Sequence, residues 1–413
     1  MAAAHAPGGA GRVPFDGTRL SDQVRLSLLW FAGNALWEAV LTIILPLLVA
    51  ADVGQARKAV ALSLVSTVGT LLASAVHPTA GWASDVTRTR FGRRRPYLLS
   101  GAVVALAGIL WLAWGHGYGQ VIAAMLLLQL GYNVGLAAYQ AYIPEIAPAH
   151  ERGRASGFLG LMTSLGALVG AIGAAFLVHG STYRLMLVLL AVLYVGGVAV
   201  TVWGLPEAPP PAEPALPAPR DPARSRDFLW VIVTRGLVML AFYTLLTYLA
   251  YFLQEVDRLA RYATDTSYVV AVTILAAALS TLWFGRRSDA VGRRAIVCGA
   301  GVVMGLGAIG FMLARGIPAI LAVGVVFGLA YGAYISVDWA LITDVLPNPG
   351  SVARDMGFWG LAITVPQVLA PLIGGGVFLL LPAGHSAYLW IFGLTGLYAV
   401  AGSALVWQVR GVR

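Results

Sequence analysis

The chain has 413 residues, of which 59% are hydrophobic and 11% are charged, and its formal net charge is +9. A soluble domain carries roughly 25% charged residues. The apolar residues here come in runs of the length that crosses a bilayer, which takes about 20 residues. The composition therefore excludes a soluble enzyme, a secreted domain and a nucleic-acid-binding module, and it indicates an all-α membrane protein in a lipid bilayer.

The apolar runs predict twelve transmembrane helices in chain order. Each run must be helical, because lipid offers no partner to an unpaired backbone group. The single cysteine, Cys298, lies in one of the runs and predicts neither a disulfide nor a metal site. The runs cover residues 24–51, 58–83, 97–115, 120–145, 157–179, 183–204, 227–254, 265–285, 295–314, 317–346, 355–381 and 386–409.

Most of the 27 basic residues fall on one side when these runs are threaded back and forth across a bilayer. They lie before the first run and after each even-numbered run. The positive-inside rule therefore predicts a multi-pass protein of the cell membrane with both termini in the cytoplasm. The basic excess is explained by topology and does not indicate a nucleic-acid partner.

The first run contains a carboxylate at depth. Glu38 lies about 21 Å from the start of the helix, near the bilayer midplane. Asn34 is one turn earlier on the same face. Because an ionisable group at this depth is costly, it marks a functional site by default. One interpretation is that Glu38 takes up the coupling proton, and the other is that a fixed hydrogen bond holds it structurally.

The connection after the second run carries the most specific motif of the chain. Residues 81–96 read Gly-Trp-Ala-Ser-Asp-Val-Thr-Arg-Thr-Arg-Phe-Gly-Arg-Arg-Arg-Pro, and residues 285–294 repeat the pattern after the eighth run. The motif resembles the signature loop of the major facilitator superfamily of transporters. Its long form is similar to that of the sugar:cation symporter and sucrose-transporter-like branch.

The resemblance implies a gate on the cytoplasmic side. Asp85 would bridge to the start of the eleventh run, and Asp289 would do the same at the fifth run. A carboxylate at a helix N-terminus is favoured by the helix dipole. The alternative is that the arginines of these loops only set topology. The remaining gating candidates are the arginines and their expected carboxylate partners: Arg93, Arg94, Glu145, Arg293 and Asp344.

The chain divides into two similar halves. Residues 205–226 hold eight of the 21 prolines and separate the halves 1–204 and 227–413 as a cytoplasmic linker. At an offset of 200 residues, Trp30 matches Trp230 and Arg154 matches Arg354. The repeat predicts two pseudo-symmetric six-helix bundles with a binding site between them.

In the family that the chain resembles, the first, fourth, seventh and tenth spans line the cavity. Arg235 and Asp338 lie at similar depth in the seventh and tenth runs, so they are expected to pair, either permanently or as a bond that solute or a proton loosens. Asp338 is the second candidate for proton coupling. The solute-binding candidates are amides, aromatic residues and this arginine: Asn34, Asn133, Tyr139, Gln140, Arg235, Tyr334, Trp339 and Gln367.

One position departs from the sucrose-type carriers. They have an arginine five residues before the acid that ends the fourth span, and this chain has Gln140 five residues before Glu145. The resemblance therefore does not extend to sucrose itself.

The sequence carries no motif for nucleotide binding, metal binding or nucleophilic catalysis, so no enzyme activity and no cofactor are expected. The energy for transport must then come from an ion gradient or from the gradient of the solute. The leading interpretation is a monomeric secondary transporter that moves a small solute by alternating access, as a proton-coupled symporter of a sugar or glycoside. The alternatives are a proton-driven exporter of drugs or metabolites and a non-transporting membrane receptor.

Overall fold

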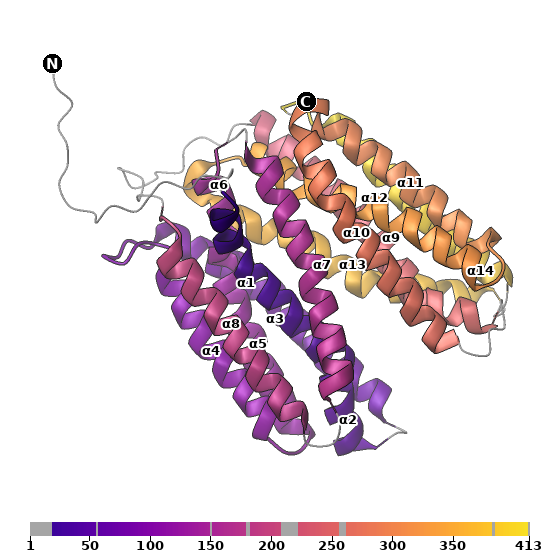
Figure 1. Ribbon diagram of the computed structural model, residues 1–413, viewed down its shortest axis with the longest axis horizontal. Helices are drawn as coiled ribbons and strands as arrows, with labels where there is room; N and C mark the ends of the chain where they lie inside the picture. Colours follow the sequence, from indigo (N-terminus) through magenta and orange to yellow (C-terminus); the bar gives the residue numbers. More distant parts are fainter. Residues whose placement is uncertain are drawn as a thin grey trace.

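The computed structural model describes residues 19–54, 57–148, 151–178, 182–207, 222–255, 262–381 and 385–411. Within these residues, twelve helical stretches are long and apolar enough to cross a membrane. The all-helical fold with twelve spans is therefore confirmed. Figure 1 shows the helices in two groups, indigo to magenta for the first half of the chain and salmon to yellow for the second.

The first half contains six of the spans. Its helices are α1 (Leu20–Ala39), a π-helical turn η1 (Val40–Ile44), α2 (Leu45–Val53), α3 (Lys58–Val86), α4 (Arg95–Trp114), α5 (Tyr118–Tyr139), α6 (Tyr142–Ile146), α7 (Arg152–Leu177) and α8 (Tyr183–Gly204). The first span is α1 with η1 and α2, and the fourth is α5 with α6.

The second half repeats the arrangement. Its helices are α9 (Pro222–Glu255), α10 (Tyr262–Val291), α11 (Arg293–Leu313), α12 (Ile317–Asp344), α13 (Val352–Leu380) and α14 (His385–Ala404), with short 3₁₀ turns η4 (Pro349–Ser351) and η5 (Leu405–Gln408). Helix α9 begins within the predicted linker, since Pro222 occupies its first position, where the missing N–H costs nothing.

The π-helical turn of the first span has a local cause. Pro46 has no backbone N–H and cannot donate to the carbonyl of Thr42, which an α-helix would require. The chain instead widens by one residue, and the N–H of Leu45 donates to the carbonyl of Val40. The wide turn begins two residues after Glu38, and such turns are frequent at functional sites.

The two halves meet at one end of the molecule. We call this the basic end, because it carries the α3–α4 and α10–α11 connections with Arg93, Arg94, Arg293 and Arg294. The opposite end is the far end. In Figure 1 the halves lie close together at the basic end, where α6 and the C-terminus are drawn, and diverge toward the far end.

Glycines let the helices of the two halves approach closely at the basic end. Gly157 of α7 and Gly285 of α10 face each other, and a Cβ built on Gly285 would lie 2.8 Å from the Cα of Gly157. Only glycine allows backbones to pack at this distance. The first half contacts the second through α7 and α10, and separately through α3 and α13.

Candidate functional site

At the basic end, Asp85 in the last turn of α3 caps the start of α13. The backbone nitrogens of Ala353 and Arg354 donate to its two carboxylate oxygens over 3.1 and 2.9 Å. The first N–H groups of a helix have no partner within the helix, and the helix dipole favours a negative charge there. The contact expected between Asp85 and the eleventh span is thus present, and it joins the two halves.

A buried charge network holds Asp85 from within the first half. Nη2 of Arg94 lies 2.7 Å from Asp85, and its Nη1 donates to Ser84 over 2.6 Å. Arg94 also pairs with Glu145, and Arg93 lies 2.6 Å from the same carboxylate. Burial alone would lower the pKa of Arg94, but Glu145 and Asp85 outweigh burial and raise it. The guanidinium is therefore a fixed cation behind the contact of Asp85 with α13.

A further carboxylate of the network was not predicted from the sequence. Glu207, three residues beyond α8, accepts a hydrogen bond of 2.5 Å from the backbone nitrogen of Arg94 and lies 3.2 Å from Nε of Arg95. It therefore caps α4 as Asp85 caps α13. The Pro-rich composition around Glu207 obscured this role, because it indicates only an extended segment.

The second half has a related network around Asp344, at the end of α12. Asp344 pairs with Arg293, and Nη1 of Arg152 lies 3.3 Å away. Arg152 comes from α7, so this ion pair also crosses between the halves, and the sequence did not single it out. The side chain of Asp289, expected at the fifth span, lies outside the side chains that the structure describes.

A second buried ion pair lies within the spans, away from the connections between helices. Arg235 of α9 pairs with Asp338 of α12, and their side chains are 3% and 1% exposed. The hydroxyl of Tyr334 donates to Asp338 over 3.1 Å. The guanidinium carbon of Arg235 lies 3.5 Å from the ring centroid of Trp359 on α13. Charge, hydrogen bond and cation–π contact thus converge where three helices meet.

Tryptophans connect this cluster to the first half. Trp359 and Trp339 pack edge to face with centroids 4.7 Å apart, and Trp339 meets Trp30 of α1 at 5.2 Å. The indole nitrogen of Trp30 donates to Thr163 over 2.6 Å. The sequence singled out Trp339 as a solute-binding candidate but missed Trp359, which lies in an apolar run.

Polar groups from three helices lie beside the buried pair. The amide nitrogen of Gln367 donates to the hydroxyl of Tyr243 over 2.8 Å. The phenol of Tyr243 lies within electrostatic range of both Glu38 and Arg235. Asn34, one turn before Glu38, donates to the backbone carbonyl of Trp30 over 2.7 Å. Gln367 and Tyr243 are therefore joined directly, and Glu38 and Arg235 act on Tyr243 through charge.

The candidates on α5 have partners of their own. Asn133 is buried and donates to Gln129 one turn earlier, over 2.8 Å to the backbone carbonyl. The hydroxyl of Tyr139 donates to the backbone carbonyl of Leu26. Gln140 is buried at the end of α5. The hydrogen bond of Tyr139 therefore joins α5 to α1, and its hydroxyl serves the contact between these two helices.

The chain belongs to the major facilitator superfamily. Residues 32–349 match the family described as MFS/sugar transport protein. The chain is therefore a transporter and not an enzyme, and it is a multi-pass membrane protein.

Two curated relatives are sugar transporters. One is the D-xylose transporter of Levilactobacillus brevis, 31% identical over 147 residues, which are 34% of this chain and 29% of that protein. The other is the probable sugar efflux transporter of Haemophilus influenzae (strain 86-028NP), 22% identical over 182 residues, which are 44% of each. The chain thus matches less than half the length of these relatives.

Solved structures share the fold along nearly the whole chain. A bacterial homologue of the iron transporter ferroportin in its outward-facing state has a TM-score of 0.75 at 14% identity and covers 95% of this chain and 99% of its own. The proton:xylose symporter XylE has 0.72 at 15%, with 94% and 95% covered. The human organic anion transporter MFSD10 has 0.72 at 16%, with 93% and 99% covered. At these identities the likeness shows the fold alone.

Proposed function

We propose that this protein takes up a neutral sugar or glycoside together with protons, by alternating access between the two halves. The observation that carries the proposal is the buried pair of Arg235 and Asp338, set against Trp359, with Tyr243 in electrostatic range of both Arg235 and Glu38. A buried ion pair contributes little net stability. Its presence at the junction of three helices is explained if a solute or a proton changes the pairing during transport.

The chemistry of the site favours a neutral, hydroxylated solute. Arg235 is already paired with Asp338, and Glu38 adds no positive charge in either protonation state. A carboxylate or phosphate on the solute would therefore have to displace Asp338 from Arg235. Amide, phenol and indole groups from Gln367, Tyr243 and Trp339 offer hydrogen bonds and flat apolar surfaces, which suit a sugar ring.

Alternating access is supported by where the halves touch. Asp85 meets α13 and Arg152 meets Asp344 at the basic end. The contact nearest the middle of α3 and α13 joins the hydroxyls of Ser74 and Thr364 over 3.4 Å. With the basic end in the cytoplasm, as the positive-inside rule predicts, this arrangement corresponds to a monomer of the cell membrane that is closed to the inside.

The proposal is tested with purified protein in proteoliposomes. Radiolabelled D-xylose, D-glucose and a disaccharide are offered with an imposed pH gradient, acid on the outer side. We expect accumulation of at least one neutral sugar, which a protonophore abolishes, and no accumulation of glucuronate or glucose 6-phosphate. The exporter alternative predicts sugar or drug movement against the proton flow. Folded protein that neither accumulates nor exchanges any of these sugars would refute the proposal.

A further inference from the structure

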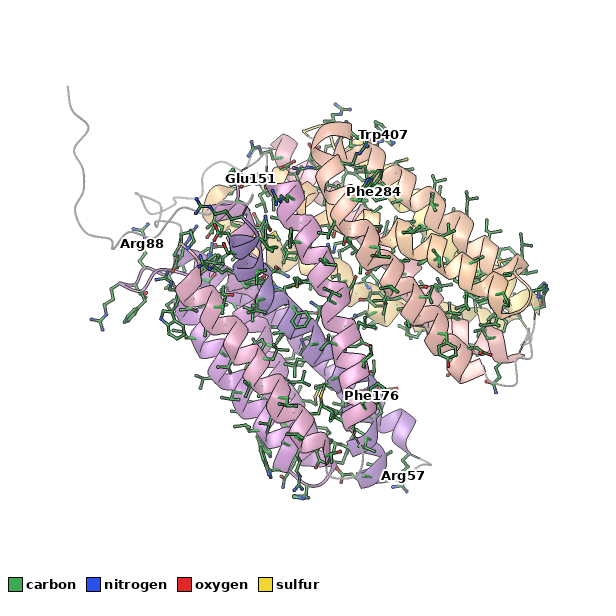
Figure 2. All side chains as sticks on the ribbon, viewed as in Figure 1. Arg57, Arg88, Glu151, Phe176, Phe284 and Trp407 are labelled. Carbon is green, nitrogen blue, oxygen red and sulfur yellow. The ribbon has the colours of Figure 1, made fainter. Side chains whose placement is uncertain are left out.

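A groove of about 490 Å³ runs along the outer surface of the second half, between α10, α11 and α12. All of its lining side chains are apolar, and they include Phe284, Val291, Ala295, Gly299, Leu329 and Ala333. The groove contains none of the polar side chains that surround Tyr243, and it has no part in the proposed transport of solute. Figure 2 shows Phe284 near the end of the molecule at which Trp407 lies.

The groove begins at the basic end and reaches toward the middle of the bilayer. Val291 ends α10 and Ala295 lies in the first turn of α11, so the entrance is at the basic end. Val303, the deepest lining residue of α11, lies about 12 Å further along the helix. One leaflet of hydrocarbon is about 15 Å thick. The groove therefore has the length of a single leaflet.

Small residues make its floor. A Cβ built on Gly299 would meet no atom within 4 Å, so the space beside this glycine is open. Ala295 lies one turn away on the same face of α11, and Ala330 and Ala333 come from α12. Phe284 and Leu329 are among the bulkier lining side chains. A trough lined by small residues beside bulkier ones suits a thin, flexible hydrocarbon chain.

A cation and an indole stand at the rim. The guanidinium carbon of Arg287 lies 5.0 Å from the ring centroid of Trp283, which is 55% exposed. Trp283 packs edge to face on the groove residue Phe284, with centroids 4.6 Å apart. Arg287 is exposed, and no carboxylate among the described side chains pairs with it. Arginine and tryptophan both favour the headgroup level of a membrane.

We propose that this groove binds one acyl chain of an anionic phospholipid, whose phosphate is held by Arg287 beside Trp283. A guanidinium binds phosphate oxygens through paired, charge-assisted hydrogen bonds. Anionic lipids are drawn to basic residues at the cytoplasmic surface, which is where the positive-inside rule places the basic end. A trough of one leaflet's length with a cation at its mouth matches the two parts of such a lipid.

The bound lipid would also contact α12. Ala330 and Ala333 line the groove, and Asp338, which pairs with Arg235, lies with Tyr334 on the adjacent face of the same helix. The lipid therefore packs on the helix that carries Asp338. This inference does not depend on which solute the protein transports.

The headgroup preference tests the cation. The protein in mild detergent is mixed with dioleoyl phosphatidylglycerol or dioleoyl phosphatidylcholine, and retained lipid is counted by native mass spectrometry. We expect wild type to retain phosphatidylglycerol about fivefold better, the preference expected for one arginine at a membrane surface, and Arg287→Ala to lose the preference. Arg184→Ala is the matched control, because Arg184 also lies over an aromatic ring, that of Tyr183, at the far end.

The open space beside Gly299 tests the groove itself. Gly299→Leu places its Cβ in this open space and its longer side chain in the trough, and it should remove the retained lipid of either headgroup. Gly393→Leu on α14 is the control, because its Cβ position is equally open. Retention unchanged by Gly299→Leu, or a headgroup preference unchanged by Arg287→Ala, overturns the proposal. Protein dimers in place of bound lipid, lost on Gly299→Leu, would assign the groove to a second copy and also overturn it.

Discussion

The carboxylate of Asp85 accepts a hydrogen bond of 2.9 Å from the backbone nitrogen of Arg354, which lies 269 positions further along the chain. On its other side Asp85 lies 2.7 Å from Arg94. When the two halves separate at the basic end, Asp85 would lose α13 but keep Arg94. The charge therefore has a partner in both arrangements, and only the backbone hydrogen bonds to α13 report whether the gate is closed.

We predict that Asp85→Asn opens the basic end. The substitution removes the negative charge at the start of α13, and hydrogen bonds to a charged group contribute about 1.5–3 kcal/mol. The closed arrangement should lose at least about tenfold in relative population. Spin labels at Arg88 and Trp407, which Figure 2 shows on different halves at this end, should give a longer distance distribution. Asp52→Asn in α2, an exposed acid, is the control and should leave the distribution unchanged.

Gly81→Ala should open the same gate without changing any charge. A Cβ on Gly81 would collide with the backbone carbonyl of Ala353 at the start of α13. Because backbone cannot yield as a flexible side chain does, α3 and α13 must move apart. The same pair of spin labels should again report a longer distance. Gly119→Ala, where a Cβ meets nothing within 4 Å, should behave like wild type; a shift of equal size in that variant would contradict the explanation.

Arg235 and Asp338 should show strong coupling in a double-mutant cycle. Arg235→Gln or Asp338→Asn alone leaves one buried charge unpaired, at a cost of about 3–5 kcal/mol. The double substitution should recover a large part of that loss. Thermal unfolding of the purified variants measures the stabilities, and a coupling near zero would show that the two side chains act independently. Asp22→Asn with Arg25→Gln is a useful comparison, because the Arg25 side chain is 50% exposed and its coupling should stay below about 1 kcal/mol.

Glu38→Gln should separate exchange from accumulation. Glutamine resembles the protonated acid and cannot release a proton. Exchange of labelled for unlabelled sugar across proteoliposomes requires no net proton movement and should continue, whereas accumulation driven by a pH gradient should be lost. Accumulation retained by the variant would assign Glu38 a structural role, with Asp338 then the remaining coupling candidate. If both activities disappear, thermal unfolding distinguishes a misfolded variant from a direct role of Glu38 in solute binding.

The sequence predicted the number of spans, because lipid forces long apolar runs to be helical. It also placed Asp85 against the eleventh span, through a family motif. Two features of the helices could have been read from single residues but were not. Pro46 denies Thr42 a backbone partner and widens the turn after Glu38, and Pro222 begins α9 inside the predicted linker.

The composition of the buried site was less accessible to sequence reasoning. Trp359 lies in an apolar run, and its position over Arg235 follows only from the packing of α13 against α9. Its polar hydroxyl and its position next to Gln140 predict a solute-binding role for Tyr139. In the structure its hydroxyl donates to Leu26 of α1. The sequence supplies the polar groups of a helix, but the neighbouring helices determine which of them are already paired.

The paired glycines Gly157 and Gly285 have a mechanical consequence. At this point the two helices touch through their backbones, and neither glycine has a side chain that fits between the side chains of the other helix. The two surfaces can therefore separate here without any change of side-chain packing. At this point of contact, separation is then opposed chiefly by the polar bonds of Asp85 to α13 and of Arg152 to Asp344. Few interactions must therefore break for the two halves to separate at this contact. The free energy of binding one solute molecule is of a size that can offset their loss.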